Sequence, residues 1–182
     1  MSIKSFIAAG ILLGGNAAAS IAADVDPVVP SDVETTASGI YLRADAGWSF
    51  LEWSGGDDDS NFVVGGGIGY QFSDFLRADI TADMSGAYDV APGAEIATTT
   101  VLGNVYLDWA NDTAFTPYIG VGAGYGWVDN NPDGMALGAS AGVAIGVTEN
   151  LALDVGYRFR DVMTSGPDVM EHQAAMGLRF KF

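Results

Sequence analysis

The sequence lacks cysteine and contains few basic residues and a single histidine. Without cysteine there are no disulfides, no thiolate metal sites and no cysteine nucleophile. Only seven Lys and Arg residues stand against 23 Asp and Glu residues, a formal charge of −16. This balance argues against nucleic-acid binding, because phosphate contacts need basic side chains on an accessible face.

Long apolar runs are also missing after the N-terminus, although 49% of the residues are hydrophobic. A membrane-spanning helix needs about 20 consecutive apolar residues, so a helical membrane protein is disfavoured. The apolar residues must instead be distributed along the chain. A length of 182 residues allows one domain and an export signal.

The N-terminus has the three parts of a cleavable signal peptide. Lys4 supplies the positive charge, residues 6–13 form a short apolar stretch, and residues 17–23 are mostly small. We predict cleavage after Ala22 and prefer this interpretation to a short buried helix. Residues 1–22 are then a signal peptide, residues 23–38 a polar periplasmic tether, and the mature charge is 6 − 23 = −17.

The remaining sequence alternates between apolar and polar residues with a period of two, which is typical of strands with two different faces. Eight segments have this pattern, each close to the 9–11 residues that a tilted membrane strand needs. We therefore predict an all-β fold, an eight-stranded antiparallel up-and-down transmembrane barrel over residues 39–182. The segments are residues 39–51, 61–72, 76–84, 100–109, 118–127, 137–147, 151–160 and 173–182.

The connections are predicted to alternate in length. Residues 73–74, 110–114 and 148–150 form short turns, whereas residues 52–60, 85–95, 129–134 and 161–171 form mostly longer loops. In bacterial outer-membrane barrels the short turns face the periplasm and the longer loops face outside. Both chain ends are then expected on the periplasmic side.

The polar face of the strands collects all the basic residues of the mature chain together with five acids. Such near-neutrality suits a confined interior, because buried charges are tolerated only when paired. The opposite face has almost no charge, which favours lipid as its solvent over a soluble carrier barrel or a soluble sandwich. The predicted lumen charge network consists of Arg43, Asp45, Arg77, Asp79, Asp83, Asp108, Asp154, Arg158, Arg160, Arg179 and Lys181.

Aromatic residues near the strand ends form two bands that resemble interfacial girdles. On the loop side these are Trp48, Phe50, Tyr125, Trp127 and Phe159, and on the turn side Tyr70, Phe72, Trp109, Phe180 and Phe182. The acidic cluster at residues 57–59 lacks the spacing of a defined calcium loop, so we interpret it as solvated and predict no metal site.

Three sequence motifs carry a resemblance to a known family. TPYIGVGAGYGW at residues 116–127, LDVGYRF at 153–159 and the ending LRFKF at 178–182 are similar to the outer-membrane β-barrel family, which includes opacity-type proteins, alphaproteobacterial major outer-membrane proteins and the OmpA transmembrane domain. The resemblance implies a location in the bacterial outer membrane and a heat-modifiable band on gels. It also implies that Phe180 and Phe182 act as the assembly signal for the barrel-assembly machinery. Nothing follows Phe182, so no appended peptidoglycan-binding domain is expected.

Three classes of function remain open: a structural or surface-exposed membrane protein, a narrow channel and a lipid-modifying enzyme. An eight-stranded barrel is just wide enough for side chains to fill, which disfavours an open porin. The only histidine, His172, is in the lipid-facing register without an evident triad partner, so no catalytic residue and no cofactor are predicted. We predict a noncatalytic protein of envelope integrity or surface interaction, with a narrow porin-like channel for ions or small solutes as the alternative. The expected partners are outer-membrane lipid, the barrel-assembly machinery and an extracellular ligand at the loops, and not nucleic acid.

Overall fold

The computed structural model describes residues 38–53, 59–129, 132–165 and 169–182, and strands account for most of them. The strands are β1 (Gly39–Trp53), β2 (Asp59–Ser73), β3 (Leu76–Ser85), β4 (Tyr88–Ala91), β5 (Ala94–Ile96), β6 (Thr98–Asp108), β7 (Phe115–Val128), β8 (Gly134–Gly146), β9 (Leu151–Met163) and β10 (Val169–Lys181). In these ranges no helix is long and apolar enough to cross a membrane. The predicted signal peptide and nearly all of the predicted tether lie outside the described residues.

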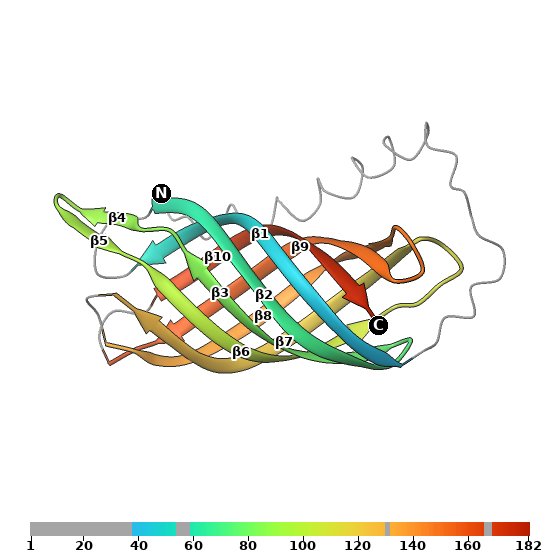
Figure 1. Cartoon of the computed structure of the whole chain (residues 1–182). Coiled ribbons are helices and arrows are strands. Elements are labelled where there is room, and N and C mark those ends of the chain that lie inside the picture. Colours follow the sequence, from blue (N-terminus) through green and yellow to red (C-terminus); the bar gives the residue numbers. More distant parts are fainter. Residues whose placement is uncertain (1–37, 54–58, 130–131, 166–168) are drawn as a thin grey trace, which may run out of the picture. The chain divides into compact units, whose positions relative to one another are not determined.

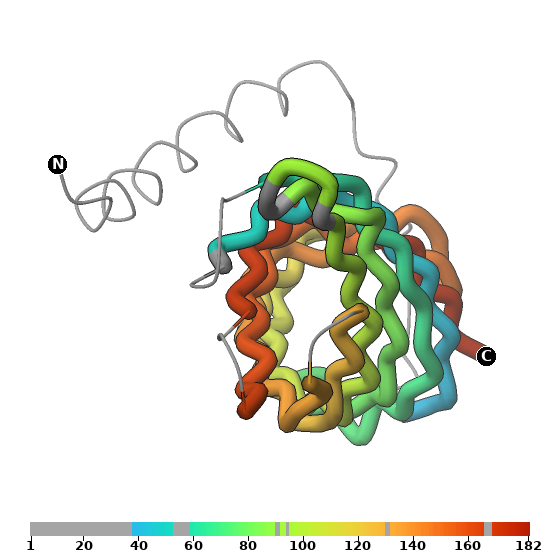
Figure 2. The backbone as a smooth tube through the Cα atoms, turned by 90° about the vertical axis from the view of Figure 1, so that its left-hand side faces the viewer, coloured from blue at the N-terminus to red at the C-terminus, as the bar shows by residue number. Residues whose placement is uncertain are grey.

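Eight of the strands close into one barrel in the order β1-β10-β9-β8-β7-β6-β3-β2. Neighbouring strands are antiparallel throughout, and β1 closes the ring by pairing with β10 from Tyr41↔Lys181 to Trp53↔Val169. Figure 1 shows the tilted strands from the side, and Figure 2 shows the closed ring from one end. The predicted all-β, eight-stranded antiparallel barrel is confirmed.

The two faces of the strands differ as the alternation predicts. Outward apolar side chains are exposed, with Val121 at 68% and Ile80 at 60%, whereas inward Arg77 and Tyr41 are fully buried. An exposed apolar belt around a polar interior is the arrangement of a barrel whose outer solvent is lipid. The facing assigned to each strand from the sequence is therefore confirmed.

The predicted strand ends and loop lengths were partly wrong. β9 continues to Met163 and β10 already begins at Val169, so the loop predicted at residues 161–171 is mostly strand. Three of the four outer connections, residues 54–58, 129–133 and 164–168, are no longer than the turn at residues 109–114. The strands continue past the apolar belt because inter-strand hydrogen bonding does not require apolar side chains.

The fourth outer connection contains a hairpin that the sequence interpretation had described as a plain loop. β4 and β5 form their own two-stranded sheet, with Tyr88 paired with Ile96 and Asp89 with Glu95. Pro92 and Gly93 make the turn between them, and Gly93 has a φ of 77°. A proline followed by a glycine at positive φ is the signature of a type II turn, which glycine adopts without strain.

Candidate functional site in the barrel lumen

The lumen is the candidate functional site, because strand alternation directs the charged side chains of the membrane segment into it. Most members of the predicted lumen charge network are buried, and Arg158, Arg179 and Lys181 are half-buried. Their contacts form three groups at successive levels of the barrel, and several of these contacts cross the lumen rather than joining adjacent strands.

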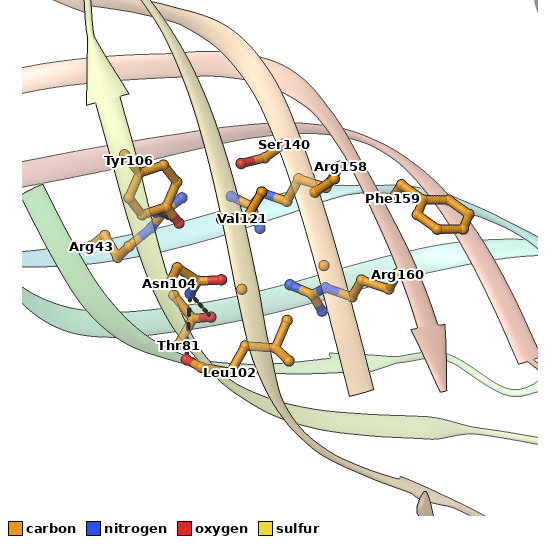
Figure 3. A pocket seen from close by; sticks show the side chains of 13 residues that line it. Arg43, Thr81, Leu102, Asn104, Tyr106, Val121, Ser140, Arg158, Phe159 and Arg160 are labelled. Carbon is orange, nitrogen blue, oxygen red and sulfur yellow. Dashed lines mark hydrogen bonds between the residues drawn. The ribbon is translucent and has the colours of Figure 1, made fainter. Parts of the chain in front are cut away.

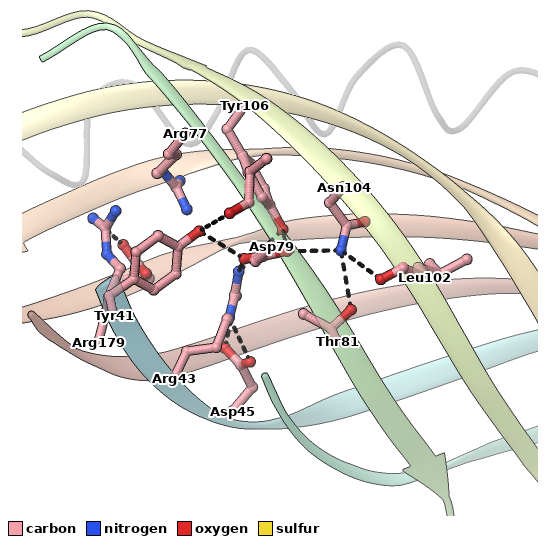
Figure 4. A network of polar contacts seen from close by, with 12 residues as sticks. Tyr41, Arg43, Asp45, Arg77, Asp79, Thr81, Leu102, Asn104, Tyr106 and Arg179 are labelled. Carbon is pink, nitrogen blue, oxygen red and sulfur yellow. Dashed lines mark hydrogen bonds and ion pairs between the residues drawn. The ribbon is translucent and has the colours of Figure 1, made fainter. Parts of the chain in front are cut away.

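Asp79 on β3 is the centre of the middle group (Figure 4). One of its oxygens, Oδ2, accepts hydrogen bonds from the Arg43 guanidinium at 3.0 Å and from the Tyr41 hydroxyl at 3.0 Å. The other, Oδ1, accepts one from the Asn104 amide at 2.8 Å and one from the Tyr106 hydroxyl at 3.3 Å. A carboxylate with this many donors keeps its charge away from water, because its lone pairs are satisfied by protein groups.

Asp45 joins the middle group to the next level. It accepts two hydrogen bonds from Arg43, both at 2.9 Å. The Arg158 guanidinium also reaches it, at 2.5 Å, from β9. Since Arg43 pairs with Asp79 as well, the three strands β1, β3 and β9 are tied together by one continuous set of ion pairs.

Asp83 on β3 is the centre of the second group, which lies nearest the end of the barrel that carries the β4–β5 hairpin. Its oxygens bind Arg160 at 2.5 Å and Arg158 at 3.4 Å, and Arg160 also donates to the Thr100 hydroxyl at 2.8 Å. β9, which carries both arginines, and β3, which carries Asp83, are four places apart in the ring of eight strands. These ion pairs therefore run across the full width of the barrel.

The third group lies nearer the short turns. Arg77 pairs with Asp108 at 2.9 Å, and its guanidinium lies 4.0 Å from the ring centre of Tyr106 and 4.8 Å from that of Tyr118. A guanidinium between two aromatic faces gains cation–π attraction that partly replaces its hydration. In the same half of the barrel Arg179 pairs with Asp154 at 3.2 Å.

Little space remains between these groups. The cavity in Figure 3 is lined by Arg43, Arg158 and Arg160, and Gly122 and Gly138 also line it. Its volume is about 20 Å³, which is room for about one water molecule. Small residues of β7 and β8 thus share the lining of this cavity with the three arginine side chains.

Glu171 is a sixth lumen acid that the sequence interpretation missed. It is 1% exposed, accepts a hydrogen bond from the Thr98 hydroxyl and another from the Gln173 amide at 2.9 Å. Thr98 is on β6 and Glu171 on β10, again four places apart in the ring. The period of two, extended from Gln173 to residue 171, would have found it, but strand eight was predicted to begin at Gln173.

Three other predicted residues lie away from these contacts. Lys181 is half-buried opposite Tyr41, near the end of β10. Phe180 and Phe182 face outward with their ring centres 5.2 Å apart in an edge-to-face arrangement. The Phe182 amide donates to the Ile40 carbonyl at 3.0 Å, which joins the last residue to the first strand.

His172 faces outward, as its register predicted. It hydrogen-bonds the Tyr157 hydroxyl, packs on the Phe159 ring at 5.1 Å, and its Nε2 lies 3.7 Å from Glu52 Oε1. Among the residues that the structure describes, no group of three or more His, Asp or Glu side chains is placed to hold a metal ion.

Comparisons with known proteins agree with this architecture. The family model described as outer membrane protein beta-barrel domain matches residues 7–182. An uncharacterized protein of Brucella abortus (strain 2308) is 26% identical over 213 residues, covering 78% of this chain and 75% of its own. Outer membrane protein PagN of Salmonella typhimurium is 30% identical over 140 residues, covering 56% of this chain and 59% of its own. The crystal structure of Neisserial surface protein A shares the fold, with a TM-score of 0.70, 24% identity and coverage of 80% of this chain and 99% of that one.

Proposed function

Because this chain belongs to the outer membrane protein beta-barrel domain family, we propose that it is a noncatalytic outer-membrane protein that supports envelope integrity or surface interaction from a closed barrel. The observation that carries this proposal is the set of contacts across the lumen. Arg158 and Arg160 reach Asp83 from the far side of the ring, and Thr98 reaches Glu171. A lumen bridged in this way favours a rigid support for surface loops over a conduit.

The alternative function, a narrow channel for ions or small solutes, has less support. Its best candidate route follows the glycine-rich wall of β7 and β8, where the cavity of about 20 Å³ holds about one water molecule. Conduction would require ion pairs such as Arg43–Asp79 to separate, and breaking a buried pair leaves uncompensated charge.

A catalytic role has little support as well. In acyl-transfer sites a histidine base needs a nucleophile on one side and an orienting group on the other. The described neighbours of His172 are the Tyr157 hydroxyl, the Phe159 ring and the Glu52 carboxylate. Both ring nitrogens thus already face a polar partner, so we propose that His172 anchors the outer end of the barrel rather than performing chemistry.

The charge of the outer end limits the chemistry of a surface ligand. All six Lys and Arg residues after Lys4 occupy lumen-facing positions, so the outer connections contain acids and no Lys or Arg. The acids in or next to these connections are Glu52, Asp57, Asp58, Asp59, Asp89, Glu95, Asp129, Asp133, Asp161 and Asp168. We therefore propose that an extracellular ligand of the loops is cationic or neutral, because like charges across an interface are unfavourable.

Two further partners follow from the outer wall. The exposed apolar belt is proposed to contact outer-membrane lipid. The exposed pair Phe180 and Phe182, at the end of the strand that closes the ring, is proposed to be the signal read by the barrel-assembly machinery.

Planar-bilayer recording of the purified protein tests the closed-barrel proposal. We expect a flat baseline after reconstitution, and reproducible conductance steps would refute the proposal in favour of the channel. The surface role is tested in cells by replacing residues 86–97 with a two-residue Asn-Gly turn. Loss of surface binding with unchanged sensitivity to detergents assigns surface interaction, and increased sensitivity with unchanged binding assigns envelope integrity.

A further inference from the structure

The β4–β5 hairpin stands apart from the barrel ladder and yet contributes to its interior. It forms a separate two-stranded sheet at one end of the barrel, where Figures 1 and 2 show it on the rim. Its paired residues Tyr88 and Ile96 are 0% and 3% exposed, whereas the next pair, Asp89 and Glu95, is exposed. One face of the hairpin base is therefore buried and the other faces outward.

The buried face packs against apolar residues from six barrel strands. We call this cluster the mouth seal, and it consists of Leu51, Tyr88, Ile96, Leu102, Val128, Ala136, Val162 and Val169. The six barrel residues lie on the lumen-facing side of β1, β6, β7, β8, β9 and β10. An apolar layer of this kind excludes water, because burial of apolar surface is favourable and offers no polar partner.

The hairpin is tied to the barrel by few polar contacts. The Gly86 amide donates to the Phe62 carbonyl at 2.8 Å, and the Asp129 amide donates to the Ala97 carbonyl at 3.0 Å. Asp89 N–H donates to the Asp59 carboxylate at 2.7 Å, and the Asn61 amide on β2 donates to the Ala87 carbonyl. Apart from the Asp89 bond, which lies within β4, these contacts are at the two ends of the hairpin, where residues 86–87 and 97 are not in strands. Rotation at these ends lifts the hairpin at the cost of the Asp89–Asp59 bond and leaves the barrel ladder intact.

Polar atoms are buried below the mouth seal without a hydrogen bond. Ser49 Oγ, Tyr88 Oη and Gln173 Oε1 have no hydrogen-bond partner among the described residues, and each of these residues is 0% exposed. Ser49 and Gln173 are directly opposite each other on β1 and β10, and Glu171 is two residues from Gln173 on the same face. The polar side chains of Ser49, Ser85 and Glu171 lie near the Tyr88 hydroxyl, and burial, followed by the nearby charge of Glu171, raises the pKa of Tyr88 to about 12.

These three buried polar atoms make the closed position of the hairpin less favourable than its apolar contacts alone suggest. A buried polar atom without a partner loses its hydration and gains nothing in return. When the hairpin lifts, water reaches these atoms and removes that penalty, while the apolar contacts of the mouth seal are lost. The two effects oppose each other, so the free-energy difference between the closed and open positions is smaller than the apolar contacts alone would make it.

We propose that the β4–β5 hairpin is a hinged closure of the outer mouth, with Tyr88 as its stopper. Opening admits water and small polar solutes to a shallow outer pocket lined by Glu171, Ser49 and Gln173. The pocket ends at the bridges from Arg158 and Arg160 to Asp83, so the barrel does not conduct when the hairpin is open.

Thiol labelling tests the closure, because the chain has no cysteine of its own. Ser49→Cys places the single thiol beneath the mouth seal, and a membrane-impermeant charged thiol reagent is added from outside. We expect slow labelling of this variant. Adding Tyr88→Ala is expected to speed it by about a hundredfold, the scale of losing one buried aromatic ring. Ile96→Ala is expected to act in the same direction.

Three controls make the result specific. Tyr88→Phe is expected to slow labelling severalfold, because it keeps the ring and removes a buried hydroxyl whose lost hydration disfavours the closed position. Asp133→Cys, on an exposed outer connection, gives the labelling rate of an unprotected thiol, with or without Tyr88→Ala. Thr81→Cys, 3% exposed in the middle of the lumen, is expected to remain unlabelled even with Tyr88→Ala. Heat-modifiable mobility on gels verifies that each variant is folded.

The outcomes that overturn the proposal are distinct. Equal labelling of Ser49→Cys with and without Tyr88→Ala shows that the hairpin is not the seal. Complete protection of Ser49→Cys over hours, with labelling only after Tyr88→Ala, shows a fixed plug and refutes hinged opening. Labelling of Thr81→Cys in the Tyr88→Ala background refutes a pocket that ends at the arginine bridges.

Discussion

Removing the Asp83 carboxylate is the sharpest test of the charge contacts across the lumen. Its side chain is 1% exposed and binds Arg160 and Arg158. In Asp83→Asn, Arg158 keeps its ion pair with Asp45, whereas Arg160 keeps the Thr100 hydroxyl and the nearby charge of Glu171. Removing one partner of a buried pair costs about 3–5 kcal/mol, and we expect about 3 kcal/mol because the Asn oxygen still accepts a hydrogen bond.

Urea unfolding in detergent micelles measures this loss through the fluorescence of the four tryptophans, with gel mobility as a second probe. The slope of the unfolding free energy against urea concentration should be unchanged, so that the shift of the unfolding midpoint reports the change in stability. Asp112→Asn, on an exposed turn, is the matched control and should stay within about 0.5 kcal/mol of the parent.

The double variant Asp83→Asn with Arg160→Met separates two contributions to the loss of stability: the lost ion pair and the cost of leaving the Arg160 charge buried without its carboxylate. It should recover at least about 1.5 kcal/mol relative to Asp83→Asn alone, because the stranded arginine is gone and contacting residues couple. A single variant that loses less than about 1 kcal/mol would refute the view that Arg160 depends on Asp83. Strict additivity in the double variant would do the same.

Two further predictions concern the inner and outer faces. A Cβ at Gly65 would collide with the Asp83 carboxylate, whereas one at Gly103 meets no atom closer than 3.8 Å; we expect Gly65→Ala to cost about 2 kcal/mol and Gly103→Ala less than about 0.5 kcal/mol in the same urea titration. Phe182→Ala is expected to lower the yield of inserted protein in cells severalfold with little change in the stability of the inserted barrel. Phe72→Ala, from a second exposed edge-to-face aromatic pair, should leave the yield unchanged, and equal losses would count against an assembly signal.

The facing of each strand could be predicted from the sequence, because the alternation is set by local geometry alone. The first predicted strand illustrates this: Trp48 and Phe50 are exposed, and Asp45 and Ser49 are buried. Strand ends were less predictable, since the hydrogen-bonded ladder continues into residues of mixed polarity. β10 begins four residues before the predicted start at Gln173, and this error hid Glu171.

The partners within the lumen could not be predicted from the same pattern. Which arginine meets which aspartate depends on strand tilt and stagger in the closed ring, and these are properties of the whole barrel. Arg158 is the clearest case, because it pairs with Asp45 on β1 and Asp83 on β3, neither of which is on a neighbouring strand. The β4–β5 hairpin was missed for another reason, since a four-residue strand and a three-residue strand are too short for a period of two to be recognised.

The distribution of charge explains why the lumen and the outer surface will respond differently to salt. Six basic residues face the lumen with six acids, the five predicted aspartates and Glu171, so the interior is balanced. The other 17 acids, 23 − 6, belong by sequence to the predicted tether, the short turns and the outer connections, which contain no Lys or Arg. Salt screens exposed charges over about 10 Å at 0.1 M and affects buried pairs much less. A cationic ligand that is added from outside and whose affinity falls steeply with salt is therefore expected at the acidic outer connections, because the balanced lumen offers no net charge to screen.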